Sequence, residues 1–298
     1  MLFLKSRLGL RHNGVPMWNR RDWIRFGLAG PIAGLRQGAA AQTFLAGVSA
    51  GVQDEEGLRR LTEELARLGI RYLESSGGGI RLADLYAGRE AEIKDEFDRR
   101  NLKLAGYAQY SMMGDATRRQ ELIELHLRIA RFAQPLGARY ITQLWTPLSR
   151  KPVAEDYRNF AANVNEVGRR VLGETGLGMG FHAEREDVVA GMLEPVMESS
   201  DPRFFGLVAD VGHFQAGGLD QLAAVKKYRS RIIAIHLRDF DPMAQGRGAF
   251  VPLGQGVIKL AALIAYLRET SFTGSVNAEG GVLEANRDYM VQRLGLEL

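Results

Sequence analysis

Short apolar runs alternate with longer segments of mixed polarity along the chain from residue 42 onward. Each run holds five to eight residues that are mostly apolar or β-branched. The runs lack a strict alternation of apolar and polar positions, which is typical of strands covered on both faces. We therefore predict eight buried strands, in segments 43–49, 70–75, 102–107, 138–145, 177–182, 205–210, 232–236 and 274–279.

The segments between these runs have a helical pattern. In 54–69 and 118–137, apolar residues recur at spacings of three and four between charged positions, as they do in amphipathic helices. Gly69, Gly137 and Gly176 stand just before the next strand, where many helices end on a glycine with a positive φ. The pattern therefore predicts a helix between successive strands.

A strand followed by a helix is the unit that repeats. The joints at 68–74 and 136–142 read LGIRYLE and LGARYIT, two copies of one helix-to-strand connection. Eight units over the 257 residues of 42–298 match the ~250 residues of an α/β protein with a single (β/α)8 TIM barrel. A doubly wound sheet is the alternative, but no Gly-x-Gly-x-x-Gly follows the first strand. The glycine-rich segment 75–85 also lacks the P-loop lysine, and we expect it to form a loop at the barrel mouth.

Residues 17–42 have the features of an export signal. They contain two adjacent arginines, a mildly apolar stretch at 26–35 and then three alanines. This resembles a twin-arginine signal cleaved after Ala41, which implies a periplasmic or secreted protein. The apolar stretch is far shorter than the ~20 residues of a membrane span, so we expect no stable membrane anchor after cleavage. The N-terminal extension and signal would then be 1–41, with Met17 as a possible start; the other interpretation is a cytosolic basic amphipathic helix.

The charge and the cysteine content of the chain limit the classes of partner and of site that it can have. The full chain carries 39 Lys and Arg against 35 Asp and Glu. Seven of the basic residues and one of the acids lie in 1–41, so the remaining 32 basic and 34 acidic residues give a net charge of −2. A barrel without excess positive charge is a poor match for nucleic acid. The lack of cysteine in the sequence excludes disulfides, thiolate metal ligands and a catalytic thiol.

Polar residues stand where the buried strands end. A charge in the middle of a barrel strand is costly, whereas the carboxyl end of the strand opens on the mouth where sites are built. The residues at or just after these ends are Glu74, Trp145, His182, Glu184, Asp210, His213, His236 and Glu279. We expect Asp210, His236 and Glu279, on three consecutive strands, to converge on one point. Two carboxylates and one imidazole suit a single divalent ion such as Mn²⁺, Mg²⁺, Co²⁺ or Zn²⁺.

Four short motifs carry a family resemblance. They are GLVADVGH at 206–213, IIAIHLRD at 232–239, FVPLGQGVIKL at 250–260 and SVNAEG at 275–280. In order, they resemble the sixth-strand Asp-x-x-His, the seventh-strand His-x-Lys-Asp, the Pro-x-Gly-x-Gly turn and the eighth-strand glutamate of one family. That family is the sugar phosphate isomerase/epimerase group of the xylose isomerase-like TIM barrels.

The resemblance implies that Asp210, His236 and Glu279 hold one divalent metal ion. Many members have a glutamate on the fifth strand where this chain has His182. Either His182 or Glu184, one pleat further along the same face, would complete the ligand set and take part in acid–base chemistry. Glu279 is a candidate base. Because ketose epimerases of the family use two glutamates, this departure favours a one-base isomerisation or a β-elimination over a two-base epimerisation.

Five further residues are candidates for substrate binding. By the same resemblance, His213 lies beside the metal, and Arg238 stands where the family usually has lysine. Arg238 or Arg247 in the following loop could bind a substrate oxygen or carboxylate. Trp145 could stack on a sugar ring or pack at the barrel rim. Glu74 could contact substrate or support a ligand residue.

These observations lead to an expected function. It is a divalent-metal-dependent isomerase or epimerase that abstracts a proton next to a carbonyl and forms an enediolate. The substrate would be an unphosphorylated sugar, keto-sugar or cyclitol. The alternatives are a lyase acting on 3-keto-glycosides by β-elimination and a non-catalytic carbohydrate-binding barrel. Endonuclease-like hydrolysis fits poorly, because it needs more metal ligands and a basic groove. Both a monomer and an oligomer are compatible with the sequence.

Overall fold

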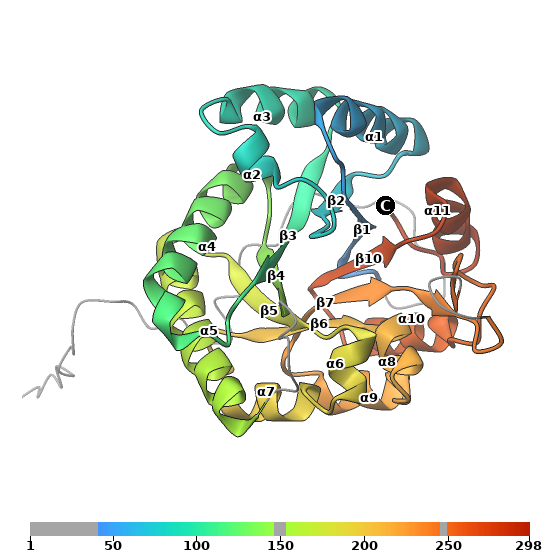
Figure 1. Ribbon diagram of the computed structural model, residues 1–298. Helices are drawn as coiled ribbons and strands as arrows, with labels where there is room; N and C mark the ends of the chain where they lie inside the picture. Colours follow the sequence, from blue (N-terminus) through green and yellow to red (C-terminus); the bar gives the residue numbers. More distant parts are fainter. Residues whose placement is uncertain (1–40, 146–152, 245–248) are drawn as a thin grey trace, which may run out of the picture. The chain divides into compact units, whose positions relative to one another are not determined.

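Eight parallel strands close into a barrel in the computed structural model, which describes residues 41–145, 153–244 and 249–298 (Figure 1). Around the barrel the strand order is β1-β10-β7-β6-β5-β4-β3-β2. Each predicted run overlaps one strand, which confirms the TIM barrel. The strands are β1 Leu45–Ala50, β2 Tyr72–Ser75, β3 Lys103–Ser111, β4 Tyr140–Trp145, β5 Gly178–His182, β6 Gly206–Asp210, β7 Ile232–Leu237 and β10 Ser275–Glu279.

Helices surround the barrel on its outside (Figure 1). The longest of those described is α5, Ala154–Thr175. The others are α1 Glu55–Leu68, α2 Leu82–Leu85, α3 Glu90–Arg99, α4 Arg119–Ala133, α6 Arg185–Val189, α7 Leu193–Ser199, α8 Val211–Ala216, α9 Gln221–Tyr228, α10 Leu260–Glu269 and α11 Leu283–Gln292, with 3₁₀ turns at Ala116–Arg118 and Gln134–Leu136.

The first helix shows how the sequence sets its bounds. The side chain of Asp54 accepts the N–H of Gly57 and caps the amino end of α1. Leu58 and Leu65 lie on the buried face of the helix, as the three- and four-residue spacing predicts. Gly69 ends the helix with φ of 70°, a conformation that costs glycine little because it has no Cβ.

The core has two parts. Most buried apolar side chains lie between the strands and the helices. A smaller cluster fills the barrel interior and consists of Tyr140, Val208 and Ala234, with the partly buried Ile233 packed against it. Tyr140 begins β4, and Ile233 and Ala234 lie near the start of β7. This cluster closes the amino-terminal end of the barrel, so the polar interior lies toward the carboxyl ends of the strands.

A hairpin after β7 was not predicted from the sequence. Strands β8 Asp239–Phe240 and β9 Phe250–Val251 pair antiparallel. The buried carboxylate of Asp239 accepts the backbone N–H groups of Gly254, Gly256 and Ile258 at 2.9 to 3.1 Å. These bonds fix the Pro-x-Gly-x-Gly turn beside the barrel mouth.

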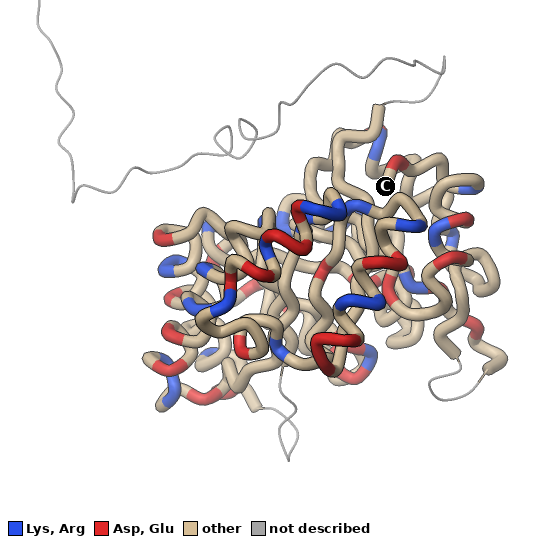
Figure 2. Tube along the Cα trace, turned by 90° about the horizontal axis from the view of Figure 1, so that it is seen from above, with Lys and Arg blue, Asp and Glu red and all other residues tan. Residues whose placement is uncertain are grey.

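Charged residues of both signs are interspersed over the helices (Figure 2). Among the described helices, none is both long enough and apolar enough to cross a bilayer. The signal predicted at 1–41 lies, apart from Ala41, outside the described residues.

Two glycines of α5 give a matched test of how tightly the helix is packed. A Cβ at Gly168 would lie 2.4 Å from the carbonyl oxygen of Phe204, whereas a Cβ at Gly173 would meet nothing within 4 Å. We predict that Gly168→Ala lowers the free energy of unfolding by about 1–3 kcal/mol through overpacking. Gly173→Ala should raise it by up to about 1 kcal/mol. Urea denaturation of both variants measures these changes, and equal effects would contradict the packing described.

Candidate metal centre and active site

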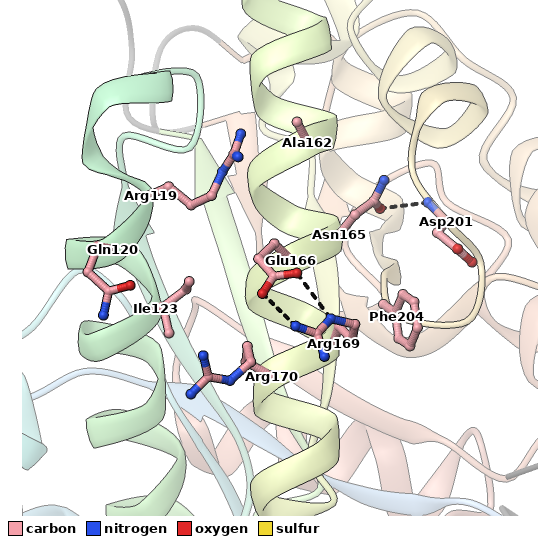
Figure 3. Close-up of a pocket in the computed structure, with 10 residues that line it drawn as sticks. All are labelled: Arg119, Gln120, Ile123, Ala162, Asn165, Glu166, Arg169, Arg170, Asp201 and Phe204. Atoms are coloured by element: carbon pink, nitrogen blue, oxygen red, sulfur yellow. Dashed lines mark hydrogen bonds and ion pairs between the residues drawn. The ribbon is translucent and has the colours of Figure 1, made fainter. Parts of the chain in front are cut away.

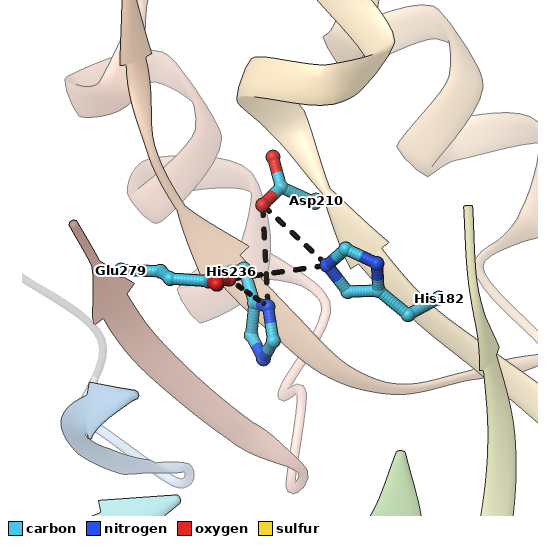
Figure 4. A group of neighbouring side chains, drawn as sticks. All are labelled: His182, Asp210, His236 and Glu279. Carbon is cyan, nitrogen blue, oxygen red and sulfur yellow. Dashed lines mark ion pairs between the residues drawn. The ribbon is translucent and has the colours of Figure 1, made fainter. Parts of the chain in front are cut away.

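Four side chains from four neighbouring strands meet at the barrel mouth. His182 ends β5, Asp210 ends β6, His236 lies in β7 and Glu279 ends β10. Each offers one ligand atom, and these atoms lie within 4.8 Å of one another (Figure 4). His182 Nε2 is 3.6 Å from Asp210 Oδ2 and 3.9 Å from Glu279 Oε2. The group contains the three residues expected from the strand ends, and its fifth-strand member is His182.

The two carboxylate oxygens of Asp210, at the end of β6, make different contacts. Its Oδ1 accepts the backbone N–H of His213 at 2.8 Å and caps the amino end of α8. Its Oδ2 faces the cluster, 4.0 Å from His236 Nδ1. The three-residue spacing between Asp210 and His213 therefore reflects the geometry of a helix cap.

Glu74 lies fully buried beneath the cluster. Its carboxylate accepts hydrogen bonds from four donors, the side chains of Tyr140, Thr142, His236 and Asn277, at 2.6 to 2.9 Å. Burial alone would raise the pKa of Glu74, but the charge and hydrogen bond of His236 and the other side-chain donors lower it. Because His236 Nε2–H donates to Glu74, the Nδ1 lone pair is turned toward the cluster. Glu74 thus orients His236 in the way that carboxylates orient metal-binding histidines.

Two buried atoms at the centre of the cluster have no hydrogen-bond partner. His236 Nδ1 and Glu279 Oε2 lie 2.7 Å apart, yet neither makes a hydrogen bond of acceptable geometry. Buried polar atoms are almost always satisfied. Two unsatisfied lone-pair atoms that face one point, with carboxylate and imidazole groups around them, fit a divalent metal ion.

Arg238 pairs with both carboxylates of the cluster and offsets part of their charge. Its Nη2 lies 2.6 Å from Glu279 Oε1 and its Nε donates to Asp210 Oδ2 at 3.2 Å, while the guanidinium rests on the ring of Phe250. Burial alone would raise the pKa of Glu279, but His236 and Arg238 hold it below its ordinary value. Glu279 therefore has one oxygen bound by Arg238 and the other at the centre of the cluster.

Glu184 lies beside the cluster and is held by two donors. His213 Nε2 is 2.9 Å from Glu184 Oε2, and the hydroxyl of Tyr110 donates to Oε1 at 3.1 Å. Glu184 Oε1 lies 3.8 Å from His182 Nδ1. Burial alone would raise the pKa of Glu184, but the hydrogen bond from His213 and the nearby histidines lower it to about 2. The carboxylate is therefore ionised at neutral pH.

The tautomer of His213 follows from its partners. Nδ1 accepts the backbone N–H of Arg185 at 2.9 Å, so the proton of the neutral ring is on Nε2 and points to Glu184. Burial lowers the pKa of His213, but Asp210 and Glu184 raise it by more, so that the pKa lies above its ordinary value. A second proton on Nδ1 would nevertheless displace the bond from Arg185. The neutral ring therefore fits the geometry best, and His213 positions Glu184.

Two of the predicted substrate-binding residues, Trp145 and Arg247, lie away from the cluster or outside the described residues, and one residue beside the cluster, Tyr110, was not predicted. Trp145 is buried and stacks on Phe160 of α5, with ring centroids 4.4 Å apart, so it packs at the rim. Arg247 lies outside the described residues. Tyr110 was missed because the third apolar run ends at Tyr107, whereas β3 continues to Ser111; the polar Gln109 interrupts the apolar pattern there.

A surface hollow of about 660 Å³ lies elsewhere, between α4 and α5 (Figure 3). Its cationic side chains are already engaged: Arg169 pairs with Glu166, Arg170 pairs with Glu174, and Arg119 donates to Asn163. None of the four clustered residues lines this hollow, so it is separate from the cluster at the barrel mouth.

The chain belongs to the xylose isomerase-like TIM barrel family, whose sequence pattern matches residues 62–290. Inosose dehydratase 2 of Bacillus cereus is 25% identical over 239 residues, which cover 70% of this chain and 78% of that protein. This similarity is consistent with an enzyme that modifies small carbohydrates.

Two solved structures have the same fold. A probable 3-DHS dehydratase from Bacillus anthracis has a TM-score of 0.65 at 14% identity and covers 83% of this chain and 99% of its own. D-Allulose 3-epimerase from Methylomonas sp., in complex with D-allulose, has a TM-score of 0.62 at 17% identity and covers 86% and 91%. At these identities the likeness shows the fold alone.

The support from Glu74 can be tested through metal affinity. We predict that Glu74→Gln weakens binding of Mn²⁺ or Co²⁺ by about 10- to 100-fold, because the amide no longer fixes the ring of His236 as a charged acceptor does. Isothermal titration calorimetry measures the affinity, and circular dichroism checks the fold. The surface variant Glu64→Gln is the control, and equal affinities in the two variants would show that Glu74 has no such role.

Metal binding should also depend on pH. Burial alone would lower the pKa of His236, but Glu74 and Glu279 raise it well above its ordinary value. The metal needs an unprotonated Nδ1, so the proton competes at every pH below this raised pKa, and affinity should rise as pH increases from about 6 to about 8. Calorimetry in buffers of different ionisation enthalpy should detect proton release. Affinity that is constant with pH, without proton release, would contradict this account.

Proposed function

We propose that the protein is a metal-dependent enzyme that removes a proton from a carbon next to a carbonyl. The substrate would be an unphosphorylated sugar, keto-sugar or cyclitol. One observation carries the proposal: the buried His236 Nδ1 and Glu279 Oε2, 2.7 Å apart and without a hydrogen bond of acceptable geometry, face the same point, beside a carboxylate, Glu184, that is held ionised.

The proposed metal ligands are His182, Asp210, His236 and Glu279. Two imidazoles and two carboxylates favour Mn²⁺, Co²⁺ or Zn²⁺ over Mg²⁺, which prefers oxygen ligands. Such an ion, when bound, would stabilise the negative charge that develops on the substrate oxygen as the proton leaves.

The proposed base is Glu184. Glu279 was the candidate from sequence, but one of its oxygens is paired with the Arg238 cation and the other is a proposed metal ligand, whereas the two oxygens of Glu184 accept hydrogen bonds from His213 and Tyr110. Glu184 is ionised, and its side chain is 28% exposed, so it is accessible from the mouth. His213 and Tyr110 hold it in place, and a shift of either donor to the substrate would make the carboxylate more basic.

A single base on one side of the substrate favours isomerisation or β-elimination over epimerisation with two opposed carboxylates. The similarity to inosose dehydratase 2 supports elimination of water as one outcome. A carbohydrate-binding barrel without activity is the competing hypothesis.

We further propose that the twin-arginine signal at 1–41 directs export. A reporter that is active only after export, fused behind residue 45, should require Arg20 and Arg21. An exported enzyme would meet unphosphorylated sugars more often than sugar phosphates, which agrees with the substrate class proposed.

Solvent exchange tests the proposed chemistry. The metal-loaded protein, incubated in deuterium oxide with inososes and 3-keto-sugars, should introduce deuterium next to the carbonyl. We predict that Glu184→Gln lowers this exchange by about 100-fold or more and leaves metal content unchanged, because Glu184 is the base and not a ligand. Mass spectrometry measures both. Sugar binding without exchange would favour the non-catalytic barrel, and loss of metal in Glu184→Gln would make Glu184 a ligand.

A further inference from the structure

Tyr110 stands on the inner side of the barrel at the end of β3. In the parallel register, Tyr110 pairs with Leu144 of β4, and Leu144 pairs with His182 of β5. Side chains paired in this way point to the same face of a sheet. Tyr110 therefore shares the mouth with His182, two strands away.

The surroundings of Tyr110 pack closely against its ring and leave the residue partly exposed. A Cβ at Gly77 would lie 3.1 Å from the ring, so the glycine of the β2–α2 loop packs closely against it. The residue is 39% exposed, and its hydroxyl donates to Glu184 Oε1 at 3.1 Å. The phenol thus combines a fixed position, access from solvent and a direct hydrogen bond to the proposed base.

The two other polar side chains at this place are less suited to donate a proton. His213 keeps its single proton on Nε2, between the ring and Glu184 Oε2, and uses Nδ1 as an acceptor. Arg238 is bound to Asp210 and Glu279, and a guanidinium does not give up its proton in proteins.

We propose that Tyr110 is the catalytic acid that protonates a departing oxygen, which makes this barrel a β-eliminating lyase. The substrate class is a polyhydroxy ketone that carries a hydroxyl or glycosidic oxygen on the β-carbon, which is the second carbon from the carbonyl carbon. The inference rests on the proposed function, with Glu184 as base.

Protons and electrons balance in this step. The C–H bond next to the carbonyl breaks, and its proton goes to Glu184. The electron pair is first held as the enolate of the ketone, and it then forms the new C=C bond as the C–O bond on the adjacent carbon breaks. The departing oxygen takes the proton of Tyr110 and leaves as water or an alcohol. Glu184 then returns its proton to Tyr110 through the hydrogen bond that joins them. Since both groups lie on one side of the site, the elimination is syn.

The test separates exchange from elimination in the full-length, metal-loaded protein. With an inosose or a 3-keto-sugar as substrate, Tyr110→Phe should lower deuterium exchange next to the carbonyl by a much smaller factor than it lowers elimination, because exchange loses only the hydrogen bond from Tyr110 to Glu184. Elimination, followed by the absorbance of the enone, should fall by about 100-fold or more. The surface variant Tyr228→Phe should change neither rate, and circular dichroism and metal content report on the fold.

A change of leaving group gives a second readout. In a substrate with fluoride in place of the β-hydroxyl, the fluoride ion leaves without needing a proton, so Tyr110→Phe should lower fluoride elimination by no more than it lowers exchange, and far less than it lowers elimination of water. An equal fall in exchange and elimination would overturn the proposal and reduce Tyr110 to a residue that positions Glu184. Exchange without elimination by the unaltered protein would overturn the lyase inference but keep the proposed function, whereas absence of exchange would remove both.

Discussion

Glu74 is a fully buried carboxylate whose four hydrogen-bond donors come from β4, β7 and β10, while Glu74 itself belongs to β2. An isolated charge at this depth would be strongly destabilising, and the four donors offset that cost. The same bonds set the rotation of the His236 ring and hence the direction of Nδ1. The geometry of the mouth therefore depends on an interaction one layer below it.

Charge compensation explains how the layer above can hold so many acids. Asp210 and Glu279 share Arg238, and a proton on His236 and a divalent ion are alternative partners for the same atoms. This arrangement also affects the chemistry. Arg238, which pairs with the carboxylates of Asp210 and Glu279, occupies one oxygen of Glu279, and this is one reason why we propose Glu184 and its two donors for the acid–base role.

The sequence predicted the barrel because strand and helix periodicities differ and repeat regularly. It also indicated which strand ends carry polar groups, since buried strands rarely end on charge without a reason. It could not determine which way each end residue points. Trp145 turns outward onto Phe160, and Glu74 turns inward beneath His236. Tyr110 escaped notice because β3 runs beyond its apolar part, and the β8–β9 hairpin because two-residue strands have no periodicity.

The double engagement of Asp210 has a consequence for how this protein could be altered. One oxygen caps the amino end of α8 and the other faces the cluster. A substitution of Asp210 would therefore affect both the helix and the proposed ion site. Replacing His182 to favour a softer metal should therefore disturb the fold less than replacing Asp210, because the His182 side chain does not cap a helix. The side chain of Asp210 is therefore placed toward the cluster as soon as β6 and α8 form.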